Sequence, residues 1–195
     1  MATVSNAKII LIAGLGNIGK KYELTRHNVG FLFIDFLAKK LSIEITNNKF
    51  HSLIGMKMID EARVILAKPQ TFMNNSGVAI SEVANFYKIP QENILIIFDD
   101  LDMELGKIKI KQGGGSAGHN GLKSIDSLLG KNYWKLKFGI GRPEHKGQVS
   151  DYVLSRFNQE EIGILEKIFG QLCSNDAEII KQEYISLLNK YHAQK

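Results

Sequence analysis

The sequence predicts an α/β fold, in which a mixed, mostly parallel and twisted sheet is flanked by helices within a single domain of residues 1–195. Two apolar runs, Lys8–Ala13 and Asn93–Phe98, are rich in β-branched residues and stop at glycine or aspartate, as buried parallel strands often do. Segments with apolar residues at helical spacing lie between such runs. Two further runs joined by a short turn predict a hairpin, which makes the sheet mixed.

The overall composition is that of an ordinary globular protein with a basic charge. A length of 195 residues is enough for one domain with a substantial core. No apolar run approaches the roughly 20 residues that span a bilayer, and the amino-terminal residues lack a signal-peptide pattern, so no membrane partner is expected. Cys173 is the single cysteine, so no internal disulfide or thiolate metal site is expected, and a cytoplasmic location is predicted. The net charge of +5 suits a polyanionic partner without requiring one.

Each further strand has its own signal. Phe50–Met58 and Arg63–Ala67 flank a polar turn, and Lys107–Gln112 alternates lysine with isoleucine, the pattern of a half-exposed strand with a basic outer face. A polar loop is expected over Arg142–Gln148. The expected strands are, in order, Lys8–Ala13, Phe50–Met58, Arg63–Ala67, Asn93–Phe98, Lys107–Gln112 and Trp134–Gly141.

The expected helices follow from apolar residues at helical spacing. Val29–Leu41 ends with Lys39 and Lys40, whose charges complement the helix dipole. Asn75 or Ser76 can cap the second helix. The full set is Val29–Leu41, Gly77–Tyr87, Leu122–Leu129, Ser150–Phe157 and Glu160–Asn189.

A glycine pattern after the first strand matches the dinucleotide-binding fingerprint G-x-G-x-x-G at Gly14, Gly16 and Gly19. In that motif the third glycine opens a helix, whereas the helical pattern here begins only near Asn28. The acidic residue expected about 20 positions further on, at the end of a second strand, is also missing, because Asp35 lies inside the first helix. The glycines therefore indicate a tight strand-exit loop with close backbone approach.

Polar side chains follow the ends of three expected strands. Asn17 follows the first strand, Asn74 follows the second strand of the hairpin, and Asp99 directly follows a buried strand. If these strands are parallel neighbours, their carboxyl ends meet at one edge of the sheet, so we expect these side chains to converge there. His27 starts the first helix and could overhang the same edge.

This set of residues permits the hydrolysis of an activated acyl bond by water. An imidazole that a carboxylate holds through one nitrogen can take a proton from water with the other nitrogen. Asparagine amides can donate to a developing oxyanion without carrying charge. A covalent nucleophile is not expected, because the chain has no G-x-S-x-G elbow and Cys173 lies in an expected helix far from these motifs.

Each of these residues also has a structural interpretation. His27 and Asn74 could simply cap the helices that follow them. The carboxylates of Asp99–Asp102 could bind Mg²⁺ or form a polar turn. Gly113–Gly118 could be a flexible connector or could form an anion-binding nest of backbone amides.

The direction of the lysine-rich strand is a separate question. The link from Phe98 to Lys107 is short enough for a hairpin. A hairpin would make this strand antiparallel and would carry the following glycine loop to the opposite edge of the sheet, unless the loop folds back.

Several motifs occur in a fixed order along the chain, and together they are highly specific. They are Gly16-Asn17, Thr25–Gly30, Lys68–Gly77, Asp99–Asp102, Gly113–Lys123, Phe138–Pro143 and Asp151–Leu154. With these motifs the sequence resembles the bacterial peptidyl-tRNA hydrolase family over nearly its whole length. That family cleaves the ester that joins a peptide to the 3′ end of tRNA, and it recycles tRNA after aborted translation. The resemblance implies a compact, monomeric α/β enzyme that needs no cofactor and no metal.

The resemblance also implies roles for individual residues. His27 would be the catalytic base and Asp99 the carboxylate that orients it. Lys111 and Lys137 match basic positions that grip the 5′-phosphate region of tRNA, and Asn120 would help to place the water. The implied substrate contacts are Asn17, Tyr22, Met73, Asn74, His119 and Asn120.

The chain departs from the family pattern at a few positions. Ile18 replaces the usual proline, Met103–Gly106 replaces Leu-Pro-x-Gly, and Lys137 replaces a frequent arginine, keeping the charge but losing the planar fork. None of these changes removes a predicted catalytic group. The alternative functions are an RNA-binding protein without hydrolase activity, which would need only the basic face, and a nucleotide-dependent oxidoreductase, which would bind NAD.

Overall fold

A seven-stranded mixed sheet forms the centre of the structure, a computed structural model that describes residues 7–143 and 145–193. The strand order is β2-β3-β4-β1-β5-β7-β6. The strands are β1 (Lys8–Gly14), β2 (Asn47–Lys49), β3 (Ser52–Ile59), β4 (Ala62–Pro69), β5 (Ile94–Asp100), β6 (Ile108–Gln112) and β7 (Trp134–Gly139). The four central strands β4, β1, β5 and β7 are parallel, while β2-β3, β3-β4 and β6-β7 pair antiparallel. The predicted mixed and mostly parallel sheet is therefore confirmed.

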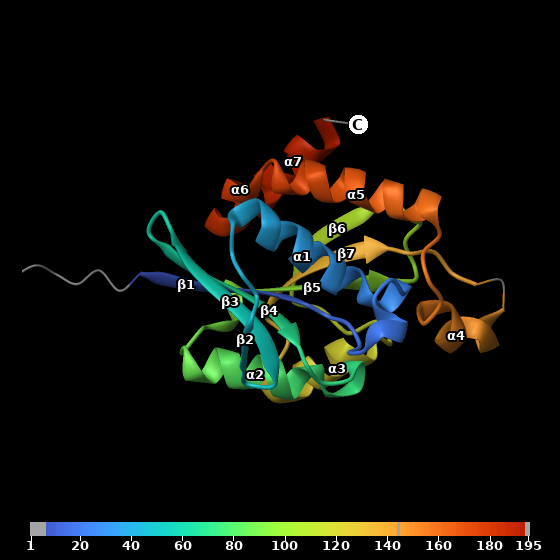
Figure 1. Ribbon diagram of the computed structural model, residues 1–195, viewed down its shortest axis with the longest axis horizontal. Coiled ribbons are helices and arrows are strands. Elements are labelled where there is room, and N and C mark those ends of the chain that lie inside the picture. Colours follow the sequence, from blue (N-terminus) through green and yellow to red (C-terminus); the bar gives the residue numbers. More distant parts are fainter. Residues whose placement is uncertain (1–6, 144, 194–195) are drawn as a thin grey trace, which may run out of the picture.

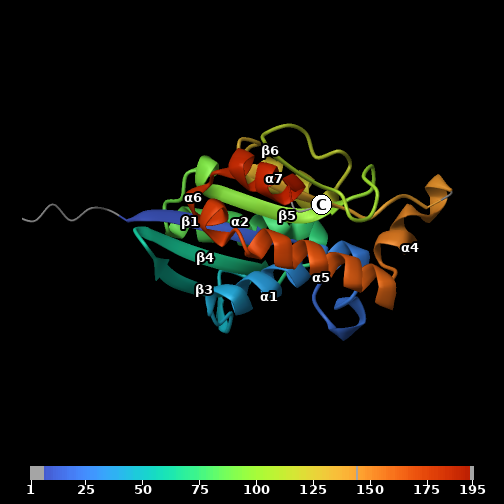
Figure 2. The ribbon, with the colours of Figure 1, turned by 90° about the horizontal axis from the view of Figure 1, so that it is seen from above.

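Helices cover both faces of this sheet. They are α1 (Val29–Leu41), α2 (Ser76–Phe86), α3 (Asn120–Leu129), α4 (Val149–Val153), α5 (Gln159–Cys173), α6 (Asp176–Lys181) and α7 (Tyr184–Ala193). Figures 1 and 2 show α1, α5, α6 and α7 on one face and α2 and α3 on the other, with α4 beyond the carboxyl ends of the strands.

The strand residues alternate between two hydrophobic clusters. In β1, Ile10 and Ile12 face the cluster under α1 and α5, whereas Leu11 and Ala13 face the cluster under α2 and α3. All four side chains are fully buried. Burial on both faces explains why the sequence of β1 is continuously apolar instead of alternating with polar residues.

The strand-exit glycines serve close packing between backbone segments. A Cβ atom on Gly14 would lie 2.1 Å from the carbonyl oxygen of Gly30 in α1, and one on Gly16 would lie 2.7 Å from the ring of Phe31. Gly19 leads into a 3-10 turn, η1 (Lys20–Tyr22), and the α-helix begins only at Val29. The glycine pattern thus allows α1 to approach the end of β1 and lacks the strand–glycine–helix geometry of a dinucleotide cradle.

The expected single helix over Glu160–Asn189 was wrong, because the structure divides this segment into α5, α6 and α7. Asn175 donates through Nδ2 to the carbonyl oxygen of Gln171, which satisfies the last turn of α5. Gln182 has a φ of 60°, so the chain leaves the helical conformation before α7. The apolar stripe continues through both breaks, which is why helical spacing alone did not reveal them.

Two shorter elements also differ from expectation. Strand β2 is three exposed polar residues at the sheet edge, so it has no apolar pattern that could reveal it. Helix α4 ends at Val153 instead of Phe157, because the chain then turns to pair with the segment before His27, where Phe157 N donates to the carbonyl oxygen of Leu24 at 2.9 Å.

The lysine-rich strand β6 does not form a hairpin with β5. Strand β7 lies between them and pairs with β6 in antiparallel register, from Ile108 opposite Phe138 to Gln112 opposite Trp134. The link between β5 and β6 therefore passes over the position of β7.

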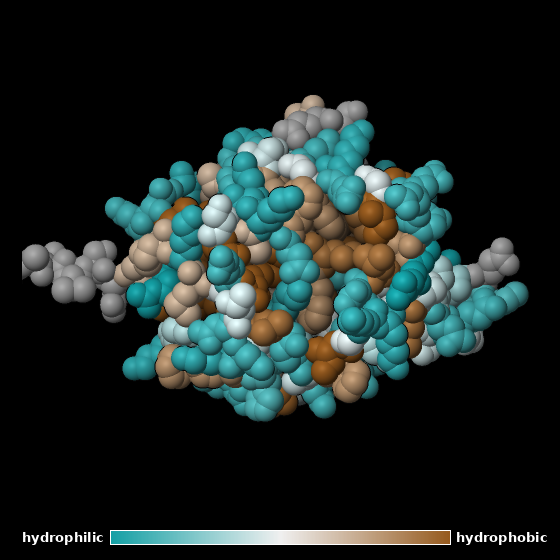
Figure 3. All heavy atoms as spheres, in the orientation of Figure 1, coloured by the Kyte–Doolittle hydropathy of each residue, from teal (hydrophilic) through white to brown (hydrophobic). Residues whose placement is uncertain are grey.

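Among the described residues, no helix is long and apolar enough to cross a membrane. On the face shown in Figure 3, hydrophobic residues gather near the middle, around α1, and hydrophilic residues surround them.

We expect Gly14→Ala to lower the free energy of unfolding by about 1–3 kcal/mol, because the added methyl group would overlap the backbone of α1. Chemical denaturation of the variant measures this change. The matched control is Gly163→Ala in α5, where a Cβ meets nothing within 4 Å, and where alanine should stabilise the helix by about 0.5–1 kcal/mol. Equal effects at both positions would contradict the close-packing role of Gly14.

Candidate active site

One cavity of about 820 Å³ lies where the carboxyl ends of the parallel strands meet. Strands β4, β1 and β5 are parallel neighbours, as the convergence of polar strand ends required. Of the residues that the sequence singled out, the cavity is lined by Asn17, His27, Met73, Asn74, Asp99, His119 and Asn120. Residues far apart in the sequence therefore share one concave site.

His27 and Asp99 form the closest pair in this cavity. His27 lies in the 3-10 turn η2 (Arg26–Asn28), directly before α1, and Asp99 is buried near the end of β5. Nδ1 of His27 is 2.8 Å from Oδ1 of Asp99. An ionised carboxylate only accepts hydrogen bonds, so Nδ1 carries the hydrogen, and in the neutral ring Nε2 keeps a lone pair. This is the tautomer that a general base needs.

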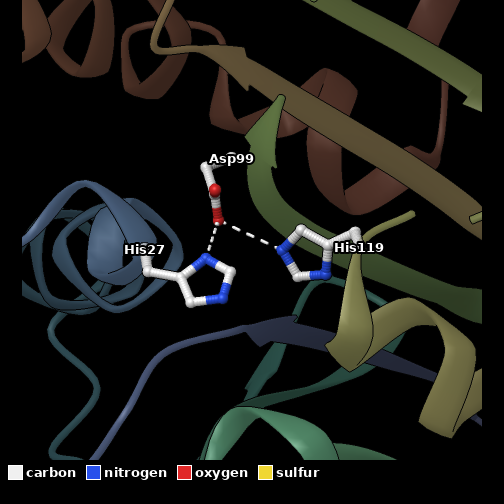
Figure 4. A group of neighbouring side chains, drawn as sticks. All are labelled: His27, Asp99 and His119. Carbon is white, nitrogen blue, oxygen red and sulfur yellow. Dashed lines mark hydrogen bonds and ion pairs between the residues drawn. The ribbon is translucent and has the colours of Figure 1, made fainter. Parts of the chain in front are cut away.

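His119 contacts the same carboxylate oxygen, with the His27 ring to the left and the His119 ring to the right of it in Figure 4. Its Nε2 is 3.1 Å from Oδ1 of Asp99, and the ring centroids of His27 and His119 are 5.0 Å apart. His119 also caps α3, because its Nδ1 accepts from the backbone N–H of Leu122 at 3.3 Å. Since Nδ1 accepts, the hydrogen of the neutral ring lies on Nε2, which donates to Asp99. One carboxylate oxygen thus receives two imidazole N–H groups.

The two imidazoles control the ionisation of Asp99. Burial alone would raise the pKa of this carboxyl, but the charges and hydrogen bonds of His27 and His119 outweigh burial and hold its pKa well below the usual range. Asp99 therefore stays ionised at neutral pH.

The single cysteine, Cys173, lies outside this site. Burial, together with the nearby carboxyl of Asp176, raises the pKa of its thiol to about 12, so this cysteine is not a nucleophile near pH 7.

His27, Asp99 and His119 could in principle hold a metal ion, since their ligand atoms all lie within 4.8 Å of one another. A ligating Nε2 on His119 would place the ring hydrogen on Nδ1, opposite the N–H group of Leu122. Two donors would then face each other. The surroundings of His119 therefore favour hydrogen bonding to Asp99 over metal ligation.

The other carboxylates after β5 have cationic partners. Asp100 is buried and paired with Lys137, and its Oδ1 accepts from the N–H of Asp102 at 2.8 Å. Asp102 is exposed and paired with Arg142. Each carboxylate serves a different contact, so this arrangement favours the polar-turn interpretation over the Mg²⁺ interpretation.

Asn17 is held in place by hydrogen bonds on both its backbone and its side chain. Its Oδ1 accepts from the N–H of Met73 at 2.9 Å. Asn28 receives the N–H of Asn17 on Oδ1 at 2.8 Å and donates through Nδ2 to the carbonyl oxygen of Asn17 at 2.9 Å. The sequence reasoning missed this role of Asn28, although Asn28 lies in the same motif as His27.

The segment after β4 supplies another wall of the cavity. Met73 is buried in the 3-10 turn η3 (Met73–Asn75), whereas Asn74 is exposed and lines the cavity. Tyr22 does not line this cavity, which differs from the expected groove contact. It lies edge-to-face with Phe72 at a centroid distance of 6.5 Å, and Phe72 is the cavity residue.

The glycine loop after β6 folds back to the cavity. The loop begins at the far edge, where Gly113 N donates to the carbonyl oxygen of Tyr133 at 3.0 Å. Gly113 and Gly114 have φ values of 67° and 80°, which L-residues rarely adopt, so the chain can reverse there. Lys135 donates to the carbonyl oxygen of Gly114 at 2.6 Å. The returning chain delivers His119 and leaves Asn120 at the cavity.

The predicted phosphate-binding lysines differ in their surroundings. Register pairs Lys111 with Lys135 and Lys109 with Lys137 across β6 and β7, on the face away from α5. Lys111 is half-buried and Lys109 is exposed. Lys137 is buried and its ammonium contacts Asp100, so the structure does not present it as a free surface cation.

A further wall comes from α4, to which the sequence reasoning assigned no role. Val149, Ser150, Val153 and Leu154 line the cavity. The sequence did carry a signal for this wall, because Val153 and Leu154 lie in the motif Asp151–Leu154, which belongs to the family pattern.

The chain is similar in sequence to known peptidyl-tRNA hydrolases. The family model described as "Peptidyl-tRNA hydrolase" matches residues 11–195. A peptidyl-tRNA hydrolase of Wolbachia sp. subsp. Drosophila simulans (strain wRi) is 52% identical over 148 residues, which are 76% of this chain and 81% of that protein. One of Ehrlichia ruminantium (strain Gardel) is 47% identical over 184 residues, which are 91% of this chain and 95% of that protein.

A solved structure shares the fold. The crystal structure of peptidyl-tRNA hydrolase from Acinetobacter baumannii superimposes with a TM-score of 0.89 at 39% sequence identity, and the match covers 95% of each chain. Both the sequence family and the three-dimensional fold therefore agree with the motifs found in order along the chain. This chain belongs to the peptidyl-tRNA hydrolase family.

Proposed function

We propose that this protein hydrolyses the ester bond between the peptide and the tRNA of peptidyl-tRNA, with water activated by His27. The observation that carries the proposal is the 2.8 Å contact between His27 Nδ1 and Asp99 Oδ1 at the wall of the cavity. This contact leaves Nε2 of His27 as the base. Membership of the peptidyl-tRNA hydrolase family supports the choice of substrate.

The proposed reaction has two steps. Nε2 of His27 takes a proton from water while the water oxygen attacks the ester carbonyl carbon, and a tetrahedral oxyanion forms. Asp99 stabilises the resulting imidazolium through Nδ1–H. The intermediate then collapses, the bond to the 3′ oxygen of tRNA breaks, and the imidazolium returns its proton to that oxygen. The products are a free peptide carboxylic acid and tRNA.

Amide groups around the cavity would bind the substrate. Asn17 uses its Oδ1 on the backbone of Met73, so its NH₂ group is the part available to substrate. Asn74 and Asn120 line the same cavity and are exposed. Neutral donors of this kind can stabilise an oxyanion or hold the peptide main chain without competing for the imidazolium charge. We assign Asn120 to the water, and Asn17, Asn74, Met73 and His119 to the peptide end.

The lysine side chains of β6 and β7 would contact tRNA phosphates. Lys111 is half-buried and Lys109 is exposed, so both can reach a polyanion. Lys137 could do so only by releasing Asp100. Phosphate contacts displace counterions, so binding should weaken steeply with salt.

We propose that residues 1–195 act as one domain and as a monomer in the cytoplasm, where translation produces peptidyl-tRNA. Neither a metal ion nor a cofactor is needed for the steps above.

The direct test is to incubate the protein with an N-blocked aminoacyl-tRNA and to follow the release of the blocked amino acid. We expect ester cleavage and free tRNA. Tight RNA binding without release would overturn the hydrolase proposal and would favour the RNA-binding alternative.

His27→Ala should lower kcat by about 10²–10⁴-fold, because the general base is lost. Steady-state kinetics with the same substrate measures the effect, and circular dichroism should show a native spectrum, since His27 is only partly buried. A variant with the wild-type rate would discard the base assignment.

Asp99→Asn tests the ionisation of the shared carboxylate. The folded-state pKa of Asp99 is lowered, so its charge contributes stability above the unfolded pKa of about 4, and this contribution disappears as the pH falls toward the folded-state value. The difference in the free energy of unfolding between wild type and Asp99→Asn should therefore narrow as the pH falls from about 5 to about 3. Urea denaturation at several pH values measures it. A difference that stays constant with pH would contradict the lowered pKa.

Lys111→Ala should weaken tRNA binding more than it slows cleavage of a minimal ester substrate that lacks the tRNA body. It should also reduce the slope of log affinity against log salt by about one. Lys39→Ala is the matched control, because Lys39 is an exposed lysine on α1, which covers the other face of the sheet. Equal losses with both substrates would argue against a phosphate contact.

A further inference from the structure

Arg26 is a buried cation beside the proposed base, and the mechanism above does not use it. Only 8% of its surface is exposed, although it lies in the 3-10 turn η2 together with His27. A buried arginine costs free energy unless its guanidinium group is well satisfied. Its contacts therefore indicate what the side chain holds in place.

The guanidinium group joins three segments. One terminal nitrogen donates to the carbonyl oxygen of Arg156 at 2.8 Å, and the other donates to Oε1 of Glu161 in α5 at 2.6 Å. The group also lies over the rings of Tyr152 in α4 and Phe157, at 4.7 Å and 5.1 Å from their centroids. Flat stacking and two divergent hydrogen bonds suit arginine and not lysine.

Backbone hydrogen bonds also connect the segment before His27 with the segment after α4. Arg26 N donates to the carbonyl oxygen of Ser155 at 3.0 Å, and Phe157 N donates to the carbonyl oxygen of Leu24 at 2.9 Å. Thr25 and Arg156 form an antiparallel bridge between them. The segment before His27 is therefore paired with the segment that follows α4.

The helix attached in this way is a wall of the cavity. Val149, Ser150, Val153 and Leu154 of α4 and its end line the cavity beside His27. Within the described chain, α4 packs chiefly against η2 and its own preceding turn η5 (Lys146–Gln148). Its Val153 also joins the hydrophobic cluster under α1 and α5, and Tyr152 OH donates to the carbonyl oxygen of Ile140 at 2.5 Å. Figures 1 and 2 show α4 projecting beyond the sheet, next to the start of α1 and the start of α5.

We propose that Arg26 is a positioning residue, which fixes the α4 wall and the His27 turn to each other so that bound substrate is held in register with the base. This inference rests on the proposed function. Glu161 contributes by anchoring the guanidinium, and it is itself fixed, because its Oε2 accepts from the N–H of Asn158 at 2.8 Å in the capping box of α5.

The consequence is a coupled effect on binding and turnover. Without the guanidinium, α4 loses its side-chain attachment to the His27 turn and to α5, so the cavity wall shifts and KM rises. His27 loses the same support, so kcat falls. A displacement of about 1 Å in the reacting groups can cost on the order of 10²-fold in rate. A variant that is only less stable would lose active enzyme and hence apparent kcat, while its KM would stay unchanged.

The experiment compares Arg26→Lys with Arg156→Lys in the full chain, with N-blocked aminoacyl-tRNA as substrate and well below the melting temperature of either variant. Arg156 lies in the same crossing, but its side chain is exposed and makes one long contact, 3.5 Å to the carbonyl oxygen of Lys20. Arg26→Lys should lower kcat/KM on the order of 10²-fold, with KM raised as well as kcat lowered. Arg156→Lys should retain wild-type kinetics.

Amide hydrogen exchange supplies the second readout. In Arg26→Lys, residues 149–157 and 24–28 should lose protection together, while β1 and β5 keep theirs. Unchanged KM, or loss of protection in only one of the two segments, would overturn the positioning role. Failure of the wild type to cleave the substrate would overturn the hydrolase proposal instead, so the two failures are distinguishable.

Discussion

One buried oxygen atom, Oδ1 of Asp99, receives the N–H groups of two imidazole rings, and the arrangement of the site depends on this sharing. The carboxylate must stay ionised in a buried position, which is costly unless donors surround it. His27 and His119 supply those donors from two separate segments of the chain. Because each ring uses one nitrogen here, the other nitrogen of His27 is left for substrate chemistry, while that of His119 caps α3.

This constraint brings three segments that are distant in the sequence together at one edge of the sheet. Asp99 lies near the end of β5, His27 precedes α1, and His119 precedes α3. Gly14 lets α1 approach the end of β1 closely enough for the turn before it to reach Asp99. The positive φ angles of Gly113 and Gly114 turn the chain after β6, and the loop returns His119 to the same edge. The glycines thus serve geometry, and none of these contacts needs a bound nucleotide.

Two buried lysines of β7, next to the site, also have polar partners. Lys137 neutralises Asp100, the residue after the shared carboxylate, and Lys135 is fully buried against the glycine loop. Burial lowers the pKa of Lys135, although Asp126 opposes this effect. The lysines of β7 therefore support the loop and the strand end, whereas in β6 Lys109 is exposed and Lys111 is half-buried. The lysines of these two neighbouring strands therefore differ in their surroundings, although all of them are basic in the sequence.

The sequence by itself determined the main strands, the first helices and the convergence of Asn17, Asn74 and Asp99, because hydrophobic periodicity is local and parallel strands align their carboxyl ends. It also indicated His27 as a base through the motif that contains it. Only the tertiary structure decided that β7 separates β5 from β6, that Lys137 faces Asp100, and that Tyr22 stands outside the cavity. It alone also revealed Asn28 and Arg26 as supports. These features depend on contacts between segments up to 135 residues apart, and no local pattern of apolar and polar residues encodes which partner a buried polar group will meet.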